Sequence, residues 1–287
     1  MKRRSDASVA TIFLAPFFVL FTIFTIVPVI YGFWMSLHNW HILAKNPVFI
    51  GLRNYGVVLA DDRFFQALSQ TFYFVVLVVP AGNLLSLCLA IGLNQRFRGL
   101  TVYRVLFYLP VITSIAVLAV MWRWLYAVDY GLINHALGMK IRWLDNVDLV
   151  MPALALMTIW WGAGGNMLVY LAALKAVPAE ILEASSLDGA NAPTRFFRMT
   201  LPAIRPAILF CVVLSVIASF QVFGQAYILT NGGPADRSLT VALYMYQMGF
   251  GQYQLGYASA VAYVLFAVVL VFTLIQFGVL RRSLQPD

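Results

Sequence analysis

Charged residues are scarce in this sequence. Of its 287 residues only 10% are Asp, Glu, Lys or Arg, whereas 62% are hydrophobic. Soluble domains are usually about 25% charged and roughly 45–50% apolar. So few charges would leave much of a water-exposed surface apolar, which argues against a soluble cytosolic enzyme. A disordered chain is excluded as well, because disorder requires low hydrophobicity.

Charge is absent altogether from six long segments, which are residues 7–44, 64–95, 105–122, 149–174, 206–235 and 238–280. A helix needs about 20 apolar residues to cross the ~30 Å hydrocarbon core of a membrane. The runs are continuous rather than alternating, which favours helices over a closed barrel. We therefore predict an all-α membrane protein, a single domain over residues 1–287, with spans near residues 10–31, 67–93, 104–125, 150–174, 207–229 and 255–280.

The positive charges lie mainly on one side of the predicted spans. If the N-terminus is cytoplasmic, 12 of the 19 Lys and Arg residues fall in inner segments and seven in outer segments. Five acidic residues lie inside and six outside, so the net charge is +7 inside and +1 outside. An excess of Lys and Arg marks cytoplasmic loops. We therefore expect both termini in the cytoplasm, and the charge of +8 requires no nucleic-acid partner.

Residues suited to disulfides or metal sites are few. Cys88 and Cys211 both fall inside predicted spans, so we expect buried thiols that act as small apolar residues rather than a disulfide. The spacing of His38 and His41 would suit a metal, but no Cys or nearby acid completes a ligand set. Surface histidines are the better interpretation, and no metal site is predicted.

The sequence also lacks a means of powering transport. A P-loop needs Gly-Lys-Ser/Thr to hold nucleotide phosphates, and none of the lysines follows a glycine. Coupling to an ion gradient usually places acids within the membrane, but the predicted spans contain none, and Arg104 and Arg123 lie near the ends of the third. No catalytic motif is present either. We predict that the chain binds no cofactor, is no enzyme, and forms a passive pathway driven by another protein.

Segment 175–202, on the predicted cytoplasmic side, contains signals for two short helices. Pro178 suits the first turn of one helix, and Gly189 is placed to end it in a left-handed conformation. Pro193 suits the start of a second helix and Leu201-Pro202 its end. Apolar side chains that nothing obvious covers are Ile181, Leu182, Leu187, Phe196 and Phe197. The segment is either a loop tucked against the helix bundle or a docking surface for a cytoplasmic partner.

Motifs along the whole chain resemble those of one family. This segment resembles the EAA loop of ABC importer permeases, through Glu183-Ala184-Ser185, Asp188-Gly189-Ala190, Phe196 and Leu201-Pro202. Further matches to the maltose-type (MalF-like) sugar permeases are Leu14-Ala15-Pro16 with Pro28, Gly51-Leu52-Arg53-Asn54-Tyr55, Gly131-Leu132-Ile133-Asn134 with Leu137, Thr230-Asn231-Gly232-Gly233-Pro234 and Gly256-Tyr257-Ala258-Ser259-Ala260. Departures are small, such as Ser185 where the family usually has Ala.

The resemblance implies a type I ABC importer permease with six transmembrane helices, in the plasma membrane of a bacterium or archaeon. Such a permease works with a second homologous permease, ATPase subunits that bind ATP and Mg²⁺, and an extracytoplasmic solute-binding protein. Residues 178–202 would be the coupling loop that docks on an ATPase, through Glu183, Ala184, Ser185, Asp188, Gly189, Ala190, Phe196, Leu201 and Pro202. Membrane lipid and a carbohydrate substrate are the other partners.

Polar and aromatic residues in the fourth and fifth spans are candidates for the substrate pathway. Sugars offer hydroxyls for hydrogen bonds and apolar faces for stacking, which amide and aromatic side chains suit. By resemblance to the maltose permease, these two spans supply the sugar contacts. The candidates are Thr158, Trp161, Asn166, Tyr170, Phe220, Gln221, Phe223 and Gln225, with Gln221 the strongest. The alternative for each is a structural role, because small and polar residues also hold membrane helices together.

The substrate and the class of transporter retain alternatives. The family resemblance covers sugars, polyols and glycerol phosphate. A phosphate would require a cationic group in the pathway, and because the spans supply few, a neutral sugar is favoured. A stand-alone secondary transporter or channel would act without an ATPase, but the lack of intramembrane acids argues against ion coupling. A scaffold or membrane enzyme has no motif to support it.

Overall fold

The computed structural model describes residues 2–43, 46–95 and 98–284. The chain divides into two compact units. The first, which we call the N-terminal unit, comprises residues 1–61 and 245–266. The second, which we call the main unit, comprises residues 62–244 and 267–287. The described residues are mostly helical, as expected for an all-α membrane protein.

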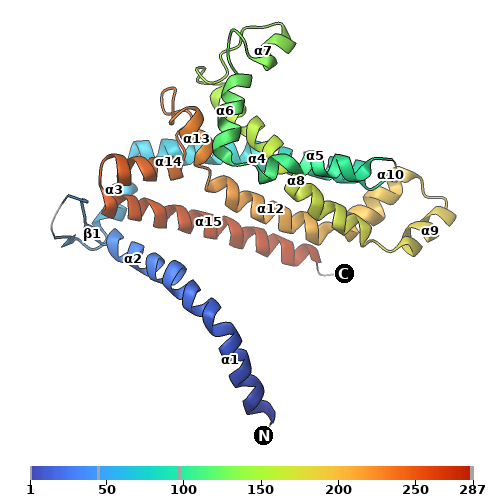
Figure 1. The fold of residues 1–287 in the computed structure, drawn as a ribbon, viewed down its shortest axis with the longest axis horizontal. Coiled ribbons are helices and arrows are strands. Elements are labelled where there is room, and N and C mark those ends of the chain that lie inside the picture. Colours follow the sequence, from blue (N-terminus) through green and yellow to red (C-terminus); the bar gives the residue numbers. More distant parts are fainter. Residues whose placement is uncertain (1, 44–45, 96–97, 285–287) are drawn as a thin grey trace. The chain divides into compact units, whose positions relative to one another are not determined.

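The N-terminal unit begins with one long apolar helical run (Figure 1). Its parts are α1 (Lys2–Phe21), the π-helical turn η1 (Thr22–Ile26) and α2 (Val27–Ser36). Pro28 lies just after the π-helical turn η1, inside the continuous helical run, so its missing N–H interrupts the helical hydrogen bonds there. The large apolar side chains of this run are exposed, Phe13 by 79% and Phe24 by 74%. So much exposed apolar surface requires lipid or another protein around the helix.

The end of α2 is fastened by hydrogen bonds to the next elements, β1 (His38–Asn39), antiparallel to β2 (Val48–Phe49), and α3 (Arg53–Val58). The Asn54 amide donates to the carbonyl oxygens of Ser36 at 2.8 Å and His38 at 3.0 Å. The Tyr55 hydroxyl lies 2.7 Å from Ser36 Oγ. The motif residues Asn54 and Tyr55 therefore bind the backbone and the serine hydroxyl at the end of the first apolar helix.

His38 is not the surface residue that the sequence suggested. It is only 8% exposed, its ring centroid lies 4.0 Å from that of Trp34, and its Nδ1 lies 2.7 Å from the Trp34 carbonyl oxygen. His41 is exposed. Over residues 2–43, 46–95 and 98–284, no group of three His, Cys, Asp or Glu residues could hold a metal. The α2–α3 connection therefore uses His38 for packing.

The second segment of this unit contains η3 (Gln247–Gly251) and the first turns of α15 (Leu255–Leu284). A Cβ at Gly256 would lie 2.0 Å from the His38 carbonyl oxygen, so a side chain there requires the backbone to move. The Tyr257 hydroxyl donates to Asp61 Oδ2 at 2.5 Å. The motif at 256–260 thus joins the start of α15 to the α2–α3 connection.

The main unit is built on α4, α8 and α12, which pack side by side, with α5 along α8 (Figure 1). Its elements are α4 (Asp62–Leu93), α5 (Leu100–Ile112), α6 (Ile115–Leu125), α7 (Leu132–Leu137), α8 (Val150–Lys175), α9 (Ala179–Leu187), α10 (Ala192–Arg195), η2 (Phe196–Thr200), α11 (Leu201–Ala203), α12 (Arg205–Phe220), α13 (Gly224–Leu229) and the start of α14 (Val241–Tyr246). Large buried side chains of the core include Phe74, Met167, Tyr170 and Phe220.

Four helices are long and apolar enough to cross a membrane: Thr11–Ser36, Asp62–Leu93, Val150–Lys175 and Leu255–Gly278. They coincide with the first, second, fourth and sixth expected spans. Two bent helix pairs, 100–125 and 192–220, raise the number to six if each is one span. The chain is therefore a multi-pass membrane protein.

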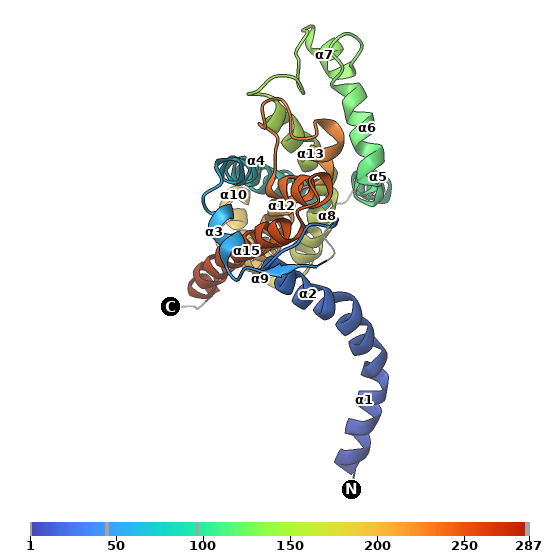
Figure 2. The same cartoon turned by 90° about the vertical axis from the view of Figure 1, so that its left-hand side faces the viewer.

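The structure differs from the third expected span, because a 101° bend separates α5 from α6 (Figure 2). Thr113 has extended backbone, with ψ of 138°, and Ser114 caps α6 by accepting a hydrogen bond from the Val117 amide at 3.4 Å. Pro110 lies in the last turn of α5. The hydropathy of the segment did not reveal this bend, because the residues at the bend are all compatible either with lipid or with the end of a helix.

The fifth expected span also differs from one continuous helix. α12 ends at Phe220 and α13 begins at Gly224. Between them Phe223 has φ of −134° and ψ of −59°, outside the helical region. Nothing in the apolar pattern of residues 207–229 marks this break, because hydrophobicity reports the environment of a segment rather than its helical continuity.

The two cysteines differ in their exposure to solvent. Cys211 is buried on α12, as expected, whereas Cys88 on α4 is exposed. Both are free thiols, in agreement with the prediction that they form no disulfide.

Candidate functional site

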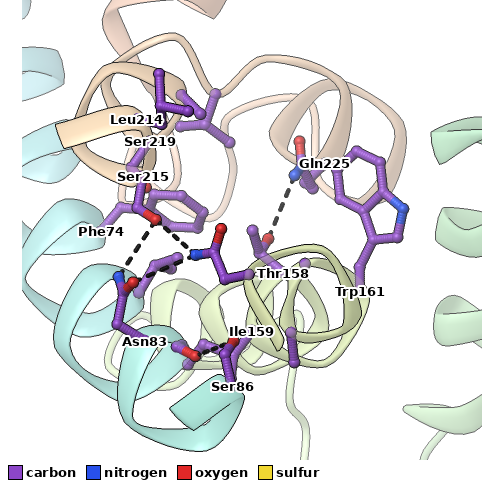
Figure 3. Close-up of a pocket in the computed structure, with 17 residues that line it drawn as sticks. Phe74, Asn83, Ser86, Thr158, Ile159, Trp161, Leu214, Ser215, Ser219 and Gln225 are labelled. Atoms are coloured by element: carbon purple, nitrogen blue, oxygen red, sulfur yellow. Dashed lines mark hydrogen bonds between the residues drawn. The ribbon is translucent and has the colours of Figure 1, made fainter. Parts of the chain in front are cut away.

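A cavity of about 280 Å³ lies in the main unit between α4, α8, α12 and the start of α13 (Figure 3). Its polar lining residues are Asn83 and Ser86 from α4, Thr158, Trp161 and Asn166 from α8, Ser215 and Ser219 from α12, and Gln225 from α13. None of the described residues that line it is ionisable. The cavity therefore offers hydrogen-bonding groups without charge.

Asn83 is the centre of a hydrogen-bond network that joins three helices. Its Nδ2 donates to Ser215 Oγ at 3.2 Å (Figure 3) and to the Val79 carbonyl oxygen at 2.8 Å. Its Oδ1 accepts from the Tyr170 hydroxyl at 2.5 Å and from Asn166 Nδ2 at 3.3 Å. Asn166 also donates to Ser215 Oγ at 3.0 Å. Asn83, only 8% exposed, thus has partners for both ends of its amide, as buried polar groups require.

A second polar contact lies at the α13 side of the cavity. Gln225 is buried, and its Nε2 donates to Thr158 Oγ1 at 3.3 Å (Figure 3). The Trp161 indole N–H is buried and has no hydrogen-bond partner among the residues that the structure describes. The nitrogen has almost no accessible surface, so Trp161 contributes the rest of its ring to the lining.

Four of the candidates from the sequence line this cavity, and they are Thr158, Trp161, Asn166 and Gln225. A fifth, Tyr170, is buried beside it and reaches it through Asn83.

The other three candidates lie outside the cavity lining. Phe220 is fully buried, with its ring centroid 5.2 Å from that of Phe272. Phe223 stacks on Tyr227 at 5.3 Å. Gln221, the strongest candidate from the sequence, is exposed and does not line the cavity.

Sequence reasoning missed four polar residues of the lining, Asn83, Ser86, Ser215 and Ser219. It considered mainly amide and aromatic residues next to the cytoplasmic segment, and so passed over the second span and the serines. The available signal was an amide near the middle of a charge-free run, since polar residues within the membrane usually face the bundle interior.

The segment 178–202 has the two short helices that the sequence predicts (Figure 1). Gly189 has φ of +80°, which confirms the left-handed helix end. Pro178 precedes α9 rather than lying within it, and Asn191 caps the second helix by accepting from the Thr194 amide at 2.9 Å. This helix runs through α10, η2 and α11 to Ala203, one residue beyond the expected end, and α12 follows at a bend of 65°.

The outer face of this segment is apolar and exposed. Leu187 is 90% exposed, Phe197 64% and Ile181 47%. Of the motif residues, Glu183, Ala184, Asp188, Gly189 and Pro202 are exposed, Ala190, Phe196 and Leu201 are half-buried, and Ser185 is buried. Ser185 Oγ donates to the Leu182 carbonyl oxygen at 2.8 Å, so the hydroxyl at this small-residue position is satisfied within the helix. The segment does not fold its apolar side chains inward.

Residues 55–284 match the model of the family described as binding-protein-dependent transport system inner membrane component. The chain is 38% identical to the probable ABC transporter permease protein YesP of Bacillus subtilis (strain 168), over 96% of this chain and 91% of that protein. It is 30% identical to the trehalose/maltose transport system permease protein MalF of Thermococcus litoralis, over 96% and 95%.

The fold also has a close match among solved structures. A chain of a bacterial ABC transporter involved in the import of the acidic polysaccharide alginate superposes with a TM-score of 0.86 at 23% identity, over 99% of both chains. The architecture is thus that of a type I ABC importer permease, and the resemblance inferred from the motifs is confirmed. The chain belongs to the family of inner membrane components of binding-protein-dependent transport systems.

Proposed function

We propose that this chain is a permease subunit of an ATP-driven importer and that it forms, with a second permease, the pathway for a neutral carbohydrate. The observation that carries this proposal is the cavity around Asn83 and Asn166, which has amide and hydroxyl groups, an aromatic ring, and no ionisable lining residue. Amides and hydroxyls both donate and accept, as a sugar's hydroxyls require. The trehalose/maltose permease among its relatives supports the same substrate class.

The lack of charged residues in the cavity lining favours a neutral substrate over an acidic one. The alginate importer handles an acidic polysaccharide. Bringing a carboxylate or phosphate out of water requires a cation or many donors nearby. The described lining residues include no cation, so glycerol phosphate and uronic acids are poor candidates.

The exposed segment 178–202 is proposed as the coupling loop for an ATPase subunit. The chain itself is no enzyme: ATP and Mg²⁺ bind on the ATPase, and an extracytoplasmic solute-binding protein delivers the sugar. Leu187 and Phe197 supply apolar anchors for docking, and Glu183 and Asp188 supply exposed charges beside them. Both termini and this loop lie in the cytoplasm of a bacterium or archaeon.

The chain connects this loop directly to the cavity walls. α8 enters the loop at Lys175 and α12 leaves it at Arg205. α8 carries Asn166 and α12 carries Ser215, which share a hydrogen bond. Ser215 is ten residues from the start of α12, or about 15 Å along the helix. A displacement of the loop by the ATPase is therefore transmitted to the cavity by the two helices that line it.

Reconstitution tests this function. The chain is expressed with its partner permease, ATPase and binding protein, and the complex is inserted into proteoliposomes. Uptake of radiolabelled trehalose and maltose should require ATP, Mg²⁺ and the binding protein. Uptake by this chain alone, without ATPase, would instead identify a stand-alone transporter or channel. ATP-driven uptake of a polyol but of neither sugar would replace the substrate class and leave the importer role intact.

Substitution of Gly189 tests the coupling loop. Gly189→Val places a β-branched residue at φ of +80°, which it strongly disfavours, so the turn between the two loop helices should distort. We expect sugar uptake to fall by about tenfold or more while the ATPase retains hydrolysis. Gly189→Asn is the matched control, because Asn tolerates the left-handed conformation and should keep most of the uptake. Wild-type uptake by Gly189→Val would rule out this role for the turn.

A further inference from the structure

We propose a second carbohydrate-binding site in the main unit, at the end of α6 and mostly outside the expected spans. It rests on the proposed function for the class of its ligand, a neutral sugar. The site is a cavity of about 680 Å³ between the α6–α7 connection, the segment before α8, and residues 229–234. Ligand cavities usually have volumes of about 300–1,000 Å³, so this one is large enough for a sugar of more than one ring.

The lining has the two kinds of group that bind sugars. Tyr126, Tyr130 and Trp143 contribute aromatic rings, and the Tyr130 side chain is 68% exposed. Asp145 is exposed, and its carboxylate has no hydrogen bond or ion pair with any residue in the described part of the chain. A carboxylate accepts hydrogen bonds from sugar hydroxyls, and an aromatic face packs against the apolar face of a sugar ring.

Arg123 adds donors to the same cavity. Its Nη2 donates to the Leu229 carbonyl oxygen at 3.1 Å and also to that of Ile228, which caps the C-terminal end of α13. The guanidinium has further N–H groups on Nε and Nη1 that form no bond within the described residues. These donors lie in the lining and suit sugar hydroxyl oxygens.

The walls are held in place by hydrogen bonds within the loops. Asn134 Nδ2 donates to the carbonyl oxygens of Ala127, Val128 and Ile141, and its Oδ1 accepts from the Trp143 indole at 2.9 Å. Burial raises the pKa of the Tyr126 phenol above its ordinary value, so its hydroxyl keeps its proton and donates to Ala153. The rings are therefore positioned before a ligand arrives, which lowers the entropic cost of binding.

The opposite wall is fixed in the same way. Thr230 Oγ1 lies 2.7 Å from Ser238 Oγ, and Ser238 donates to the Gly233 carbonyl oxygen at 2.6 Å. The motif at 230–234 thus forms a wall of this cavity.

The chemistry favours a neutral sugar over a protein segment. Protein interfaces gain most of their affinity from Trp, Tyr and Arg anchors in fully desolvated pockets, whereas Arg123, Tyr130 and Asp145 of this cavity are exposed. An acidic sugar is disfavoured because it would meet the unpaired carboxylate of Asp145, whereas Asp129, also in the lining, is paired with Lys140 at 2.9 Å. A ligand that both donates and accepts, and that carries no charge, satisfies these groups.

Tryptophan fluorescence of the full complex in nanodiscs, without the binding protein, tests the site. The probes are trehalose, maltose and maltotriose. A sugar-dependent change in emission should be lost in Trp143→Phe, which assigns it to this cavity. The apparent Kd should rise about tenfold in Tyr130→Ala and in Asp145→Asn. The matched controls, Leu132→Ala and Asp148→Asn, change exposed residues of the same loop that do not line the cavity, and should bind as wild type.

The proposal is overturned if the sugar response at Trp143 is absent, or if the Kd is unchanged in both cavity variants. An unchanged Kd together with weaker stimulation of the ATPase by the binding protein would make the cavity a docking surface for that protein. Either result with ATP-driven sugar uptake intact leaves the proposed function standing, whereas absence of uptake in the wild-type complex counts against that function itself.

Discussion

At the scale of single residues, Asn83 unites structure and proposed function. An isolated amide in an apolar core costs free energy unless its groups are paired. Here the amide joins α4 to Tyr170 and Asn166 on α8 and to Ser215 on α12. The same residue therefore fixes the three helices and presents polar surface at the cavity.

Removal of the Asn83 amide should destabilise the complex. Asn83→Ala leaves the buried Tyr170 hydroxyl without its acceptor, at a cost of about 1–3 kcal/mol in the free energy of unfolding. Thermal unfolding of the purified complex measures this. Asn94→Ala, at an exposed position at the end of the same helix, is the control and should match wild type. Addition of Tyr170→Phe should recover part of the loss; equal stability of Asn83→Ala and wild type would contradict the network.

The residue scale also shows where sequence reasoning succeeded and failed. Residue chemistry, together with the resemblance to the maltose permease, identified Thr158, Trp161, Asn166 and Gln225. Gln221 and Gln225 are four residues apart and would share one face of an unbroken helix. The break before Gly224 separates them, so Gln225 lines the cavity and Gln221 is exposed.

At the scale of elements, the contact of α8 with α5 depends on one glycine. A Cβ at Gly164 would lie 2.1 Å from the Phe107 carbonyl oxygen and 2.9 Å from its carbonyl carbon. These are backbone atoms of α5, so no side-chain rotation relieves the clash. Glycine thus permits a close approach of the two helices, as small residues often do in membrane proteins.

Gly164→Ala should therefore force α5 and α8 apart. We expect a loss of about 1–3 kcal/mol in the free energy of unfolding, or failure of the complex to assemble. Yield from membranes and thermal unfolding measure it. Gly165→Ala is the control, because its Cβ would lie 3.9 Å from Val111 Cγ1, an ordinary contact. If Gly164→Ala and Gly165→Ala had the same effect, the close approach of α5 and α8 would not explain the need for glycine at position 164.

Element boundaries were only partly predictable. Local signals located the ends of α9 well, since Gly189 and Pro178 act through their own backbones. The bend at Thr113 and Ser114 was not predicted from hydropathy, although Pro110 and the capping Ser114 are local signals beside it. Hydrophobicity identified the apolar segments and left open how each one bends.

At the scale of the whole molecule, the distribution of charge predicts the topology. The charge-free runs predicted apolar helices that the structure contains, and the bias of Lys and Arg predicts which loops lie inside. The division into two units was not predictable, because it depends on contacts between distant parts of the chain.

Labelling of single cysteines tests the orientation. In a background with Cys88 and Cys211 replaced by Ala, we introduce Leu187→Cys in the proposed coupling loop and Asp148→Cys in an expected outer loop; both positions are exposed. In intact cells made permeable only at the outer membrane, a membrane-impermeant maleimide should label the Asp148→Cys variant alone. The Leu187→Cys variant should react only after the inner membrane is opened. The reverse pattern would invert the topology.

The short helix α13 gives the two cavities a common wall. Gln225 lines the cavity around Asn83, and Leu229 lines the cavity at the end of α6. The two residues are four positions apart, about 6 Å along the helix axis. With sugar in both cavities, one helical turn would be the partition between them. We expect a single sugar ring to occupy one cavity at a time and a chain of several rings to reach both. This geometry would make the pathway a gauge of substrate length, with oligosaccharides held at two points and monosaccharides at one.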